Sequence, residues 1–185
     1  MILSGDRRFP PALAAAMAVG FDSDSERDGE SDGDGDYGVD FEPFPDFLSA
    51  DETTEWFRDW TGNDELTGDD FRVFGQDGTG GYAAFWLARP GRALDEQPVV
   101  FLGSEGETGV VARNLGAFLW LLADGLGPWE AATAYEPDQT PQPNPALTAV
   151  AEKFAPSFRA PAATVIEQAA GEFPDFDDTI MELCS

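Results

Sequence analysis

The stretch that decides the fold is the apolar heptapeptide Tyr82-Ala83-Ala84-Phe85-Trp86-Leu87-Ala88. Successive residues of a strand point to opposite faces of a sheet, and here both alternating sets are apolar. A strand that is apolar on both faces must be covered on both sides. The sequence therefore predicts a central strand at residues 82–88, with other elements packed above and below it.

Shorter strands and amphipathic helices are predicted before and after this strand in the sequence. Apolar runs at 71–74 and 98–102 predict two further strands. Ser49-Ala50-Asp51-Glu52 has the capping-box pattern and predicts a helix that runs through Trp60 and stops at Gly62. Three more helices are predicted, approximately at 114–124, 145–154 and 162–170.

The length of 185 residues suits one domain. We expect residues 41–185 to form this domain, with folded structure beginning near Phe41. Residues 1–40 are expected to form an N-terminal segment in which 22–40 is a disordered acidic linker, because it holds almost nothing apolar to bury. At its start, Arg7-Arg8 and the Ala-rich stretch that follows fit either a twin-arginine export signal or a short helix.

The linker also contains the alternating acids Asp32, Asp34 and Asp36, which resemble a calcium-binding loop. The positions that such a loop reserves for glycine and for its closing glutamate hold Tyr37 and Pro43. The sequence therefore predicts no specific metal site there.

The chain has 36 acidic residues against 10 basic ones, and its net charge is −26. Phosphate backbones and anionic lipids repel such a protein, so we expect neither a nucleic-acid partner nor a membrane. No apolar run reaches the roughly 20 residues of a membrane span. A basic protein is the natural complement, since opposite fields speed encounter. The alternative is that the charge serves solubility alone.

The absence of histidine and the presence of a single cysteine, Cys184, exclude several kinds of site. Ser–His and Cys–His nucleophile pairs, histidine metal ligands, an internal disulfide and a cysteine-rich zinc site all need residues that the chain lacks. We therefore expect no cofactor and no metal.

Two loops next to predicted strands carry acidic residues of interest. The glycine-rich loop 75–81 lacks the Lys-Ser/Thr ending of a phosphate-binding loop, so it is interpreted as a wide turn in which Asp77 braces local amides. Glu105 and Glu107 follow the predicted strand 98–102. Paired carboxylates can act as a general acid and base, which leaves a carboxylate-based hydrolase as one alternative.

The segment 71–124 resembles the SUKH superfamily of Smi/Knr-type proteins. The resemblance lies in the order of three parts: a glycine-bearing turn at 74–81, a strand with an acidic turn at 98–106, and a helix that begins Asn114-Leu115-Gly116-Ala117-Phe118-Leu119. It implies an α+β fold, with a mixed, mostly antiparallel sheet flanked by helices. The family's opening helix, with its Leu-Pro signature, is not evident here.

The resemblance also implies a binding protein without catalytic residues. Many bacterial members are similar to immunity proteins that bind and block a cognate toxin, often a nuclease, inside the producing cell. We therefore expect a cytoplasmic, non-enzymatic protein that occludes a basic toxin, with a regulatory adaptor as the alternative. Loops on a rigid sheet usually carry recognition, so the expected contact residues are Asp77, Glu105 and Glu107.

Overall fold

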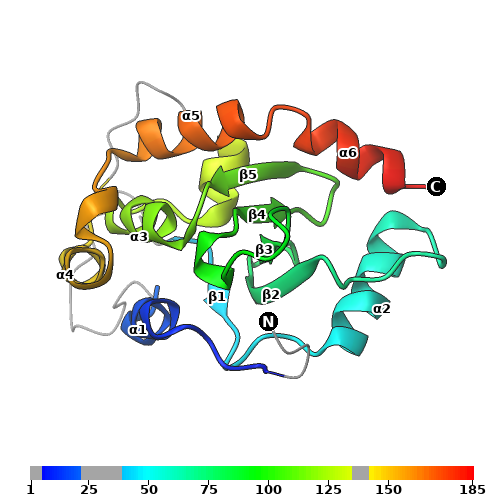
Figure 1. Cartoon of the computed structure of the whole chain (residues 1–185), viewed down its shortest axis with the longest axis horizontal. Coiled ribbons are helices and arrows are strands. Elements are labelled where there is room, and N and C mark those ends of the chain that lie inside the picture. The colour runs from blue at the N-terminus through cyan, green and yellow to red at the C-terminus, as the bar shows by residue number, and fades with distance from the viewer. Residues whose placement is uncertain (1–5, 22–38, 135–141) are drawn as a thin grey trace, which may run out of the picture.

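The computed structural model describes residues 6–21, 39–134 and 142–185 (Figure 1). Within these residues a five-stranded sheet has the order β1-β2-β3-β4-β5, and every pairing between neighbours is antiparallel. The expected α+β fold is confirmed. The strands are β1 (Glu42–Pro43), β2 (Phe71–Gln76), β3 (Tyr82–Trp86), β4 (Val99–Leu102) and β5 (Thr108–Ala112).

Strand β3 lies in the middle of the sheet, as its two apolar faces predicted. Ala83 and Phe85 belong to a core on one face, whereas Ala84 belongs to a second core on the other. All three residues are at most 1% exposed. The apolar alternation of β3 is therefore satisfied by covering layers on both sides of the sheet.

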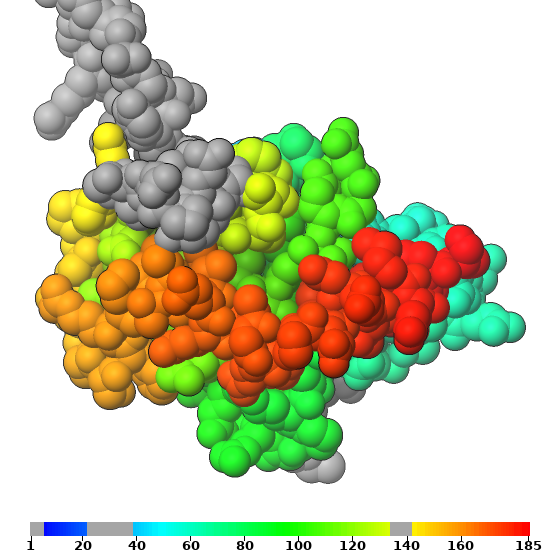
Figure 2. Space-filling model, turned by 90° about the horizontal axis from the view of Figure 1, so that it is seen from above, coloured from blue at the N-terminus to red at the C-terminus, as the bar shows by residue number. Residues whose placement is uncertain are grey.

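Two groups of helices form these covering layers. Helices α1 (Pro11–Val19), α3 (Leu115–Ala123) and α4 (Pro145–Phe154) lie on the Phe85 face, and α5 (Ala162–Glu172) packs against β5. Helices α2 (Ala50–Thr61) and α6 (Phe176–Leu183) contribute Phe57, Phe176 and Ile180 to the core on the Ala84 face. Figure 1 shows α3 and α2 on opposite sides of the sheet, and Figure 2 shows α5 and α6 in succession along one side of the molecule. Three short helical turns complete the described chain, η1 (Leu94–Glu96), η2 (Glu130–Ala134) and η3 (Pro156–Phe158).

The helix ends follow the sequence signals. The Ser49 side chain accepts the backbone N–H of Glu52, and Glu52 accepts the backbone N–H of Ser49, so the predicted capping box is present. Gly62 ends α2 in the left-handed conformation with φ 67°. Asn114 caps α3, whose residues are buried on all sides except at Gly116. This all-round burial makes α3 a core helix rather than an amphipathic surface helix.

Helix α1 belongs to the folded body. Leu13 and Ala16 are completely buried, and α1 packs against α3 and α4. The folded structure thus begins before Phe41, where the sequence placed its start, because α1 buries Leu13, Ala16 and Met17. Residues 22–38, including Asp32, Asp34 and Asp36, lie outside the described residues, so the structure does not bear on the expected linker.

The sequence did not predict β1, β5 or α6. Strand β5 contains Gly109 and has only two buried residues, Val111 and Ala112, so its apolar pattern is weak. Helix α6 buries only Phe176 and Ile180, which are separated by acidic residues. Both elements are short: β5 is held by its pairing with β4, and α6 by the packing of Phe176 and Ile180 against the sheet.

Truncation of Leu13 tests whether α1 is part of the domain. We expect Leu13→Ala to lower the free energy of unfolding by about 2–4 kcal/mol, because the removed side chain leaves a cavity between helices. Val19→Ala, on the same helix, removes a side chain that is 38% exposed and should cost under about 1 kcal/mol. Urea denaturation measures both, and equal small losses would show that α1 does not stabilise the fold.

Candidate protein-binding surface

The turns that carry the predicted contact acids are neighbours in space. The β2–β3 turn holds Asp77, and the β4–β5 turn holds Glu105 and Glu107. The Ser104 hydroxyl donates a hydrogen bond to the Thr79 hydroxyl over 3.1 Å and so joins the two turns. The structure thus brings together the loops that the sequence selected, at one end of the sheet.

Asp77 is nevertheless buried, with 3% of its surface exposed. Its Oδ1 accepts three hydrogen bonds, from the backbone N–H groups of Thr79 (2.9 Å) and Gly81 (2.8 Å) and from the Thr79 hydroxyl (2.8 Å). The predicted bracing of the turn is confirmed. This burial argues against the contact role predicted for Asp77, because its Oδ1 is occupied inside its own turn.

Glu105 is exposed and Glu107 is partly exposed, so both are accessible. Glu107 Oε2 accepts the backbone N–H of Glu105 over 3.2 Å, which fixes the shape of the turn. The same turn contacts both helices of the Ala84 face. Trp60 Nε1 on α2 donates to the Gly103 carbonyl over 2.7 Å, and the Thr108 hydroxyl donates to Asp177 Oδ1 at the start of α6 over 2.5 Å.

Helices α2 and α6 are themselves joined. Asn63 Nδ2 donates to the Leu183 carbonyl over 3.2 Å, and the Ser185 backbone N–H donates to the Thr61 carbonyl over 3.0 Å. Figure 1 shows the C-terminal end of α6 next to α2. The α2 segment, the β4–β5 turn and α6 therefore form one continuous side of the molecule.

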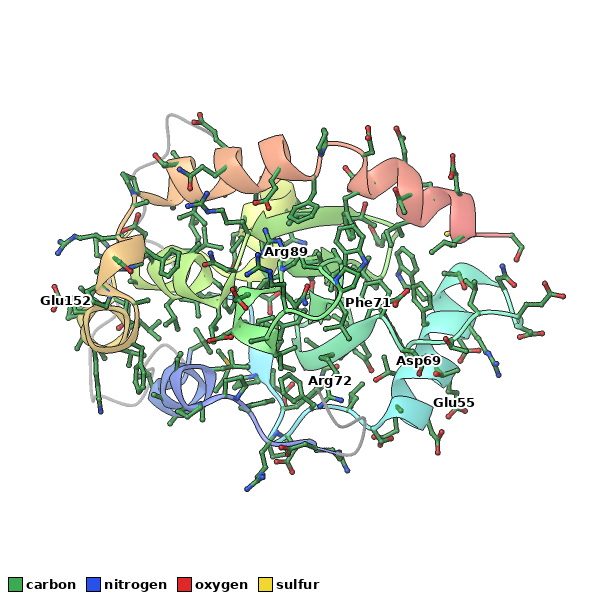
Figure 3. The ribbon with its side chains drawn as sticks, in the orientation of Figure 1. Glu55, Asp69, Phe71, Arg72, Arg89 and Glu152 are labelled. Carbon is green, nitrogen blue, oxygen red and sulfur yellow. The ribbon has the colours of Figure 1, made fainter. Side chains whose placement is uncertain are left out.

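This side carries a dense set of exposed carboxylates, which we call the acidic end. Figure 3 shows two of them, Glu55 and Asp69, beside α2. Among the described residues of these segments, Arg58 is the one basic residue, and its Nε is bound to the Leu66 carbonyl at 2.6 Å. The acidic end comprises Asp46, Asp51, Glu52, Glu55, Asp59, Asp64, Glu65, Asp69, Asp70, Glu105, Asp175, Asp177, Asp178 and Glu182, all of them exposed.

Several arginines outside the acidic end are paired with carboxylates of their own. Arg89 is paired with Glu172, Arg92 with Glu96 at 3.2 Å, and Arg159 with Glu152 at 3.4 Å. At the edge of the acidic end, Arg7, from the segment before α1, lies 3.8 Å from Glu52. The remaining carboxylates of the acidic end have no ion-pair partner among the described residues, so their charge is available to a partner.

Glu52 remains ionised at the edge of this surface. Hydrogen bonds from the Ser49 backbone and hydroxyl lower the pKa of its carboxyl. Burial raises the pKa of the neighbouring Tyr82 hydroxyl, and the charge of Glu52 acts in the same direction. Glu52 thus keeps its negative charge under ordinary conditions.

Glu130, on η2, is a partly buried carboxyl of a different kind. Burial raises its pKa, although its Oε1 accepts the backbone N–H of Asp40 over 2.9 Å. A hydrolase would need a second carboxyl that converges with it on a cavity. The charge of the nearby Asp40 carboxylate adds to the raised pKa, but this carboxylate accepts the backbone N–H of Gly78 over 2.8 Å. Through its bond to the Asp40 backbone, Glu130 fastens this part of the chain to the body of the protein.

One cavity of about 360 Å³ lies between η1, the start of α3 and the end of α4. Asp95 and Glu96 are part of its lining, together with Arg89 and Arg92. Because Glu96 is paired with Arg92, the cavity does not present two facing carboxyls. A larger hollow of about 420 Å³ on α2 is lined by Asp51, Glu55, Asp59 and Asp64 together with Arg58.

Comparison of the chain with models of protein families, with curated proteins and with solved structures gave no match. Among the described residues, no group of three or more acidic or cysteine side chains is placed to hold a metal ion. In the same part of the chain, no helix is long and apolar enough to cross a membrane.

Sequence reasoning missed α2 and α6 as parts of the surface. For α2, the density of acids was visible: nine of the residues from 46 to 70 are acidic. For α6 four acids within residues 175–182 were visible as well, but its position beside α2 depends on the packing of Phe176 and Ile180 against the sheet.

Replacement of Asp77 tests its bracing role. We expect Asp77→Ala to lower the free energy of unfolding by about 1–3 kcal/mol, because two backbone donors and one hydroxyl lose their acceptor. The matched variant Glu105→Ala, in the adjacent turn, should change stability by less than about 0.5 kcal/mol. Denaturation of both variants in urea makes the comparison, and equal effects would refute the structural assignment of Asp77.

Glu130 predicts a specific dependence of stability on pH. Because its pKa is raised in the folded protein, the folded state binds this proton more readily than the unfolded state. Stability therefore rises as pH falls through the raised pKa, and Glu130→Gln should be more stable than the natural protein at pH about 8.

This difference in stability should shrink as the pH approaches the pKa of the glutamate carboxyl in the unfolded state, about 4.3. Urea denaturation across this pH range measures it, with the exposed substitution Glu167→Gln as a control. A difference between Glu130→Gln and the natural protein that stays constant with pH would contradict the assignment.

Proposed function

We propose that this protein is a non-enzymatic binding protein whose acidic end holds a basic protein partner. The observation that carries the proposal is the concentration of exposed carboxylates on α2, the β4–β5 turn and α6, with Arg58 as the one base among them. Acids that served solubility alone would not need to gather on one side.

The physical chemistry of such a surface favours fast and selective association. Like-signed carboxylates on one side produce a field that attracts a basic protein, raises the association rate and rejects acidic competitors. The rigid sheet and the two helices keep the surface in one shape, so little conformational entropy is lost on binding. The Trp60–Gly103 and Thr108–Asp177 hydrogen bonds hold the turn and the helices together.

We further propose that the partner is a basic toxin of the nuclease type. The protein would then act as the cytoplasmic immunity protein against this toxin. A nuclease carries a basic groove for phosphates, and an acidic surface can fill this groove. The SUKH resemblance supports the same assignment. The residues that carry the resemblance lie in the turn before β3, in strand β4 with the turn after it, and in helix α3.

The test compares two triple variants as baits for co-purification from the native host. Glu55→Gln, Asp59→Asn and Glu182→Gln together neutralise part of the acidic end. Asp95→Asn, Glu152→Gln and Glu167→Gln remove the same charge from exposed positions elsewhere. Mass spectrometry identifies the proteins captured by the natural protein and by each variant.

We expect the first triple variant to weaken binding of the captured basic protein roughly tenfold and to reduce its dependence on salt, whereas the second triple variant binds normally. Inhibition of a captured nuclease would support the immunity role, and a basic regulatory protein would support the adaptor alternative. Equal binding by both triple variants would refute the acidic end as the binding surface.

A further inference from the structure

A row of paired residues crosses the end of the sheet that lies next to the two turns. Glu42 pairs with Gln76, Gln76 with Tyr82, Tyr82 with Leu102, and Leu102 with Thr108. Directly paired residues share one face of an antiparallel sheet. Since Tyr82 and Leu102 contact the core beneath α2 and α6, the whole row belongs to the face that these helices cover.

Four aromatic rings gather over this row, and we call them the aromatic patch: Phe44, Trp56, Trp60 and Tyr82. Trp56 stacks on Tyr82 with ring centroids 4.5 Å apart, and Phe44 meets Tyr82 edge-on at 5.8 Å. Trp60 extends the group on the other side of Trp56, at 6.2 Å. The rings come from three separate elements of the chain, and the fold brings them together.

The aromatic patch is not closed off from solvent. All four rings are partly exposed, whereas core aromatics such as Phe57, Phe74 and Phe85 are at most 2% exposed. Partly exposed tryptophan and tyrosine side chains are the residues that most often supply the binding energy of protein interfaces. The patch therefore differs from the core in a way that packing alone does not require.

Carboxylates surround the aromatic patch. Glu52 lies one helical turn before Trp56, and its charge acts on the Tyr82 hydroxyl. Glu42 lies in the same sheet row and accepts a hydrogen bond from Gln76 Nε2 over 3.2 Å. Glu105 follows Gly103, whose carbonyl binds Trp60. All three glutamates are exposed.

Aromatic rings surrounded by carboxylates are best suited to bind the side chain of arginine. A guanidinium group stacks on aromatic faces, is weakly hydrated and can bind a carboxylate through two parallel hydrogen bonds. An ammonium group is more strongly hydrated and offers no planar surface. Charge attraction alone would not distinguish the two.

We propose that the aromatic patch receives an arginine side chain of the basic partner, stacked on Trp56 or Tyr82 and paired with Glu105. This inference rests on the proposed function, because it names the partner group that the acidic end selects. It makes the aromatic patch the source of specificity, while the surrounding acids supply attraction at long range.

The test uses two blocked, fluorescently labelled peptides of equal length and charge, one alternating glycine with arginine and the other glycine with lysine. Fluorescence anisotropy at low salt measures their binding to the full chain. We expect the arginine peptide to bind roughly two- to fivefold more tightly. The preference should disappear in Trp56→Leu and persist in Trp129→Leu, a matched truncation of a partly buried tryptophan in the other core.

The outcomes separate the inference from the proposed function. Equal, salt-sensitive binding of both peptides would retain the acidic end and overturn the role of the aromatic patch. Failure of both peptides to bind would contradict the inference and the proposed function alike. A preference for arginine that survives in folded Trp56→Leu would also overturn the inference.

A second measurement covers the case in which Trp56→Leu does not fold. In the natural protein, the arginine peptide should shift the indole N–H resonances of Trp56 and Trp60 in the NMR spectrum and leave those of Trp120 and Trp129 unchanged. Shifts confined to Trp120 and Trp129 would overturn the inference.

Discussion

The structure depends on the burial of both faces of one antiparallel sheet. Strand β4 is completely buried, with Val99, Val100, Phe101 and Leu102 at most 1% exposed. Such a strand requires a helical layer on each side. Helix α3 fills one side with its apolar surface, and α2 and α6 cover the other. The acids of α2 and α6 can then face only outward, so burial of the sheet also creates the acidic end.

Self-repulsion among so many like charges opposes the compact state. The fold accommodates it because the acids of the acidic end are all exposed, where water and ions screen them. The hydrogen bonds that join α2, the β4–β5 turn and α6 are donated by uncharged side chains, those of Trp60, Thr108 and Asn63. An acidic surface held by these hydrogen bonds is consistent with the proposed recognition of another protein.

The sequence predicted elements whose signals are local. The two apolar faces of β3 and the capping box at Ser49 were confirmed because each depends on neighbouring residues. The place of α1 in the core and the existence of β5 and α6 depend on contacts with residues distant in the sequence. The local residue patterns of these three elements therefore did not reveal them. The same limit explains Asp77: the sequence placed it correctly in a turn, but only the coordinates show that its carboxylate faces inward.

The most direct test of the central claim is a hydrogen–deuterium exchange footprint of the partner captured from the native host. The account predicts protection in α2, the turn at residues 103–107 and α6, with α4 and α5 unchanged. Protection confined to α4 and α5, with α2 and the turn unaffected, would contradict the claim that the acidic end is the recognition surface.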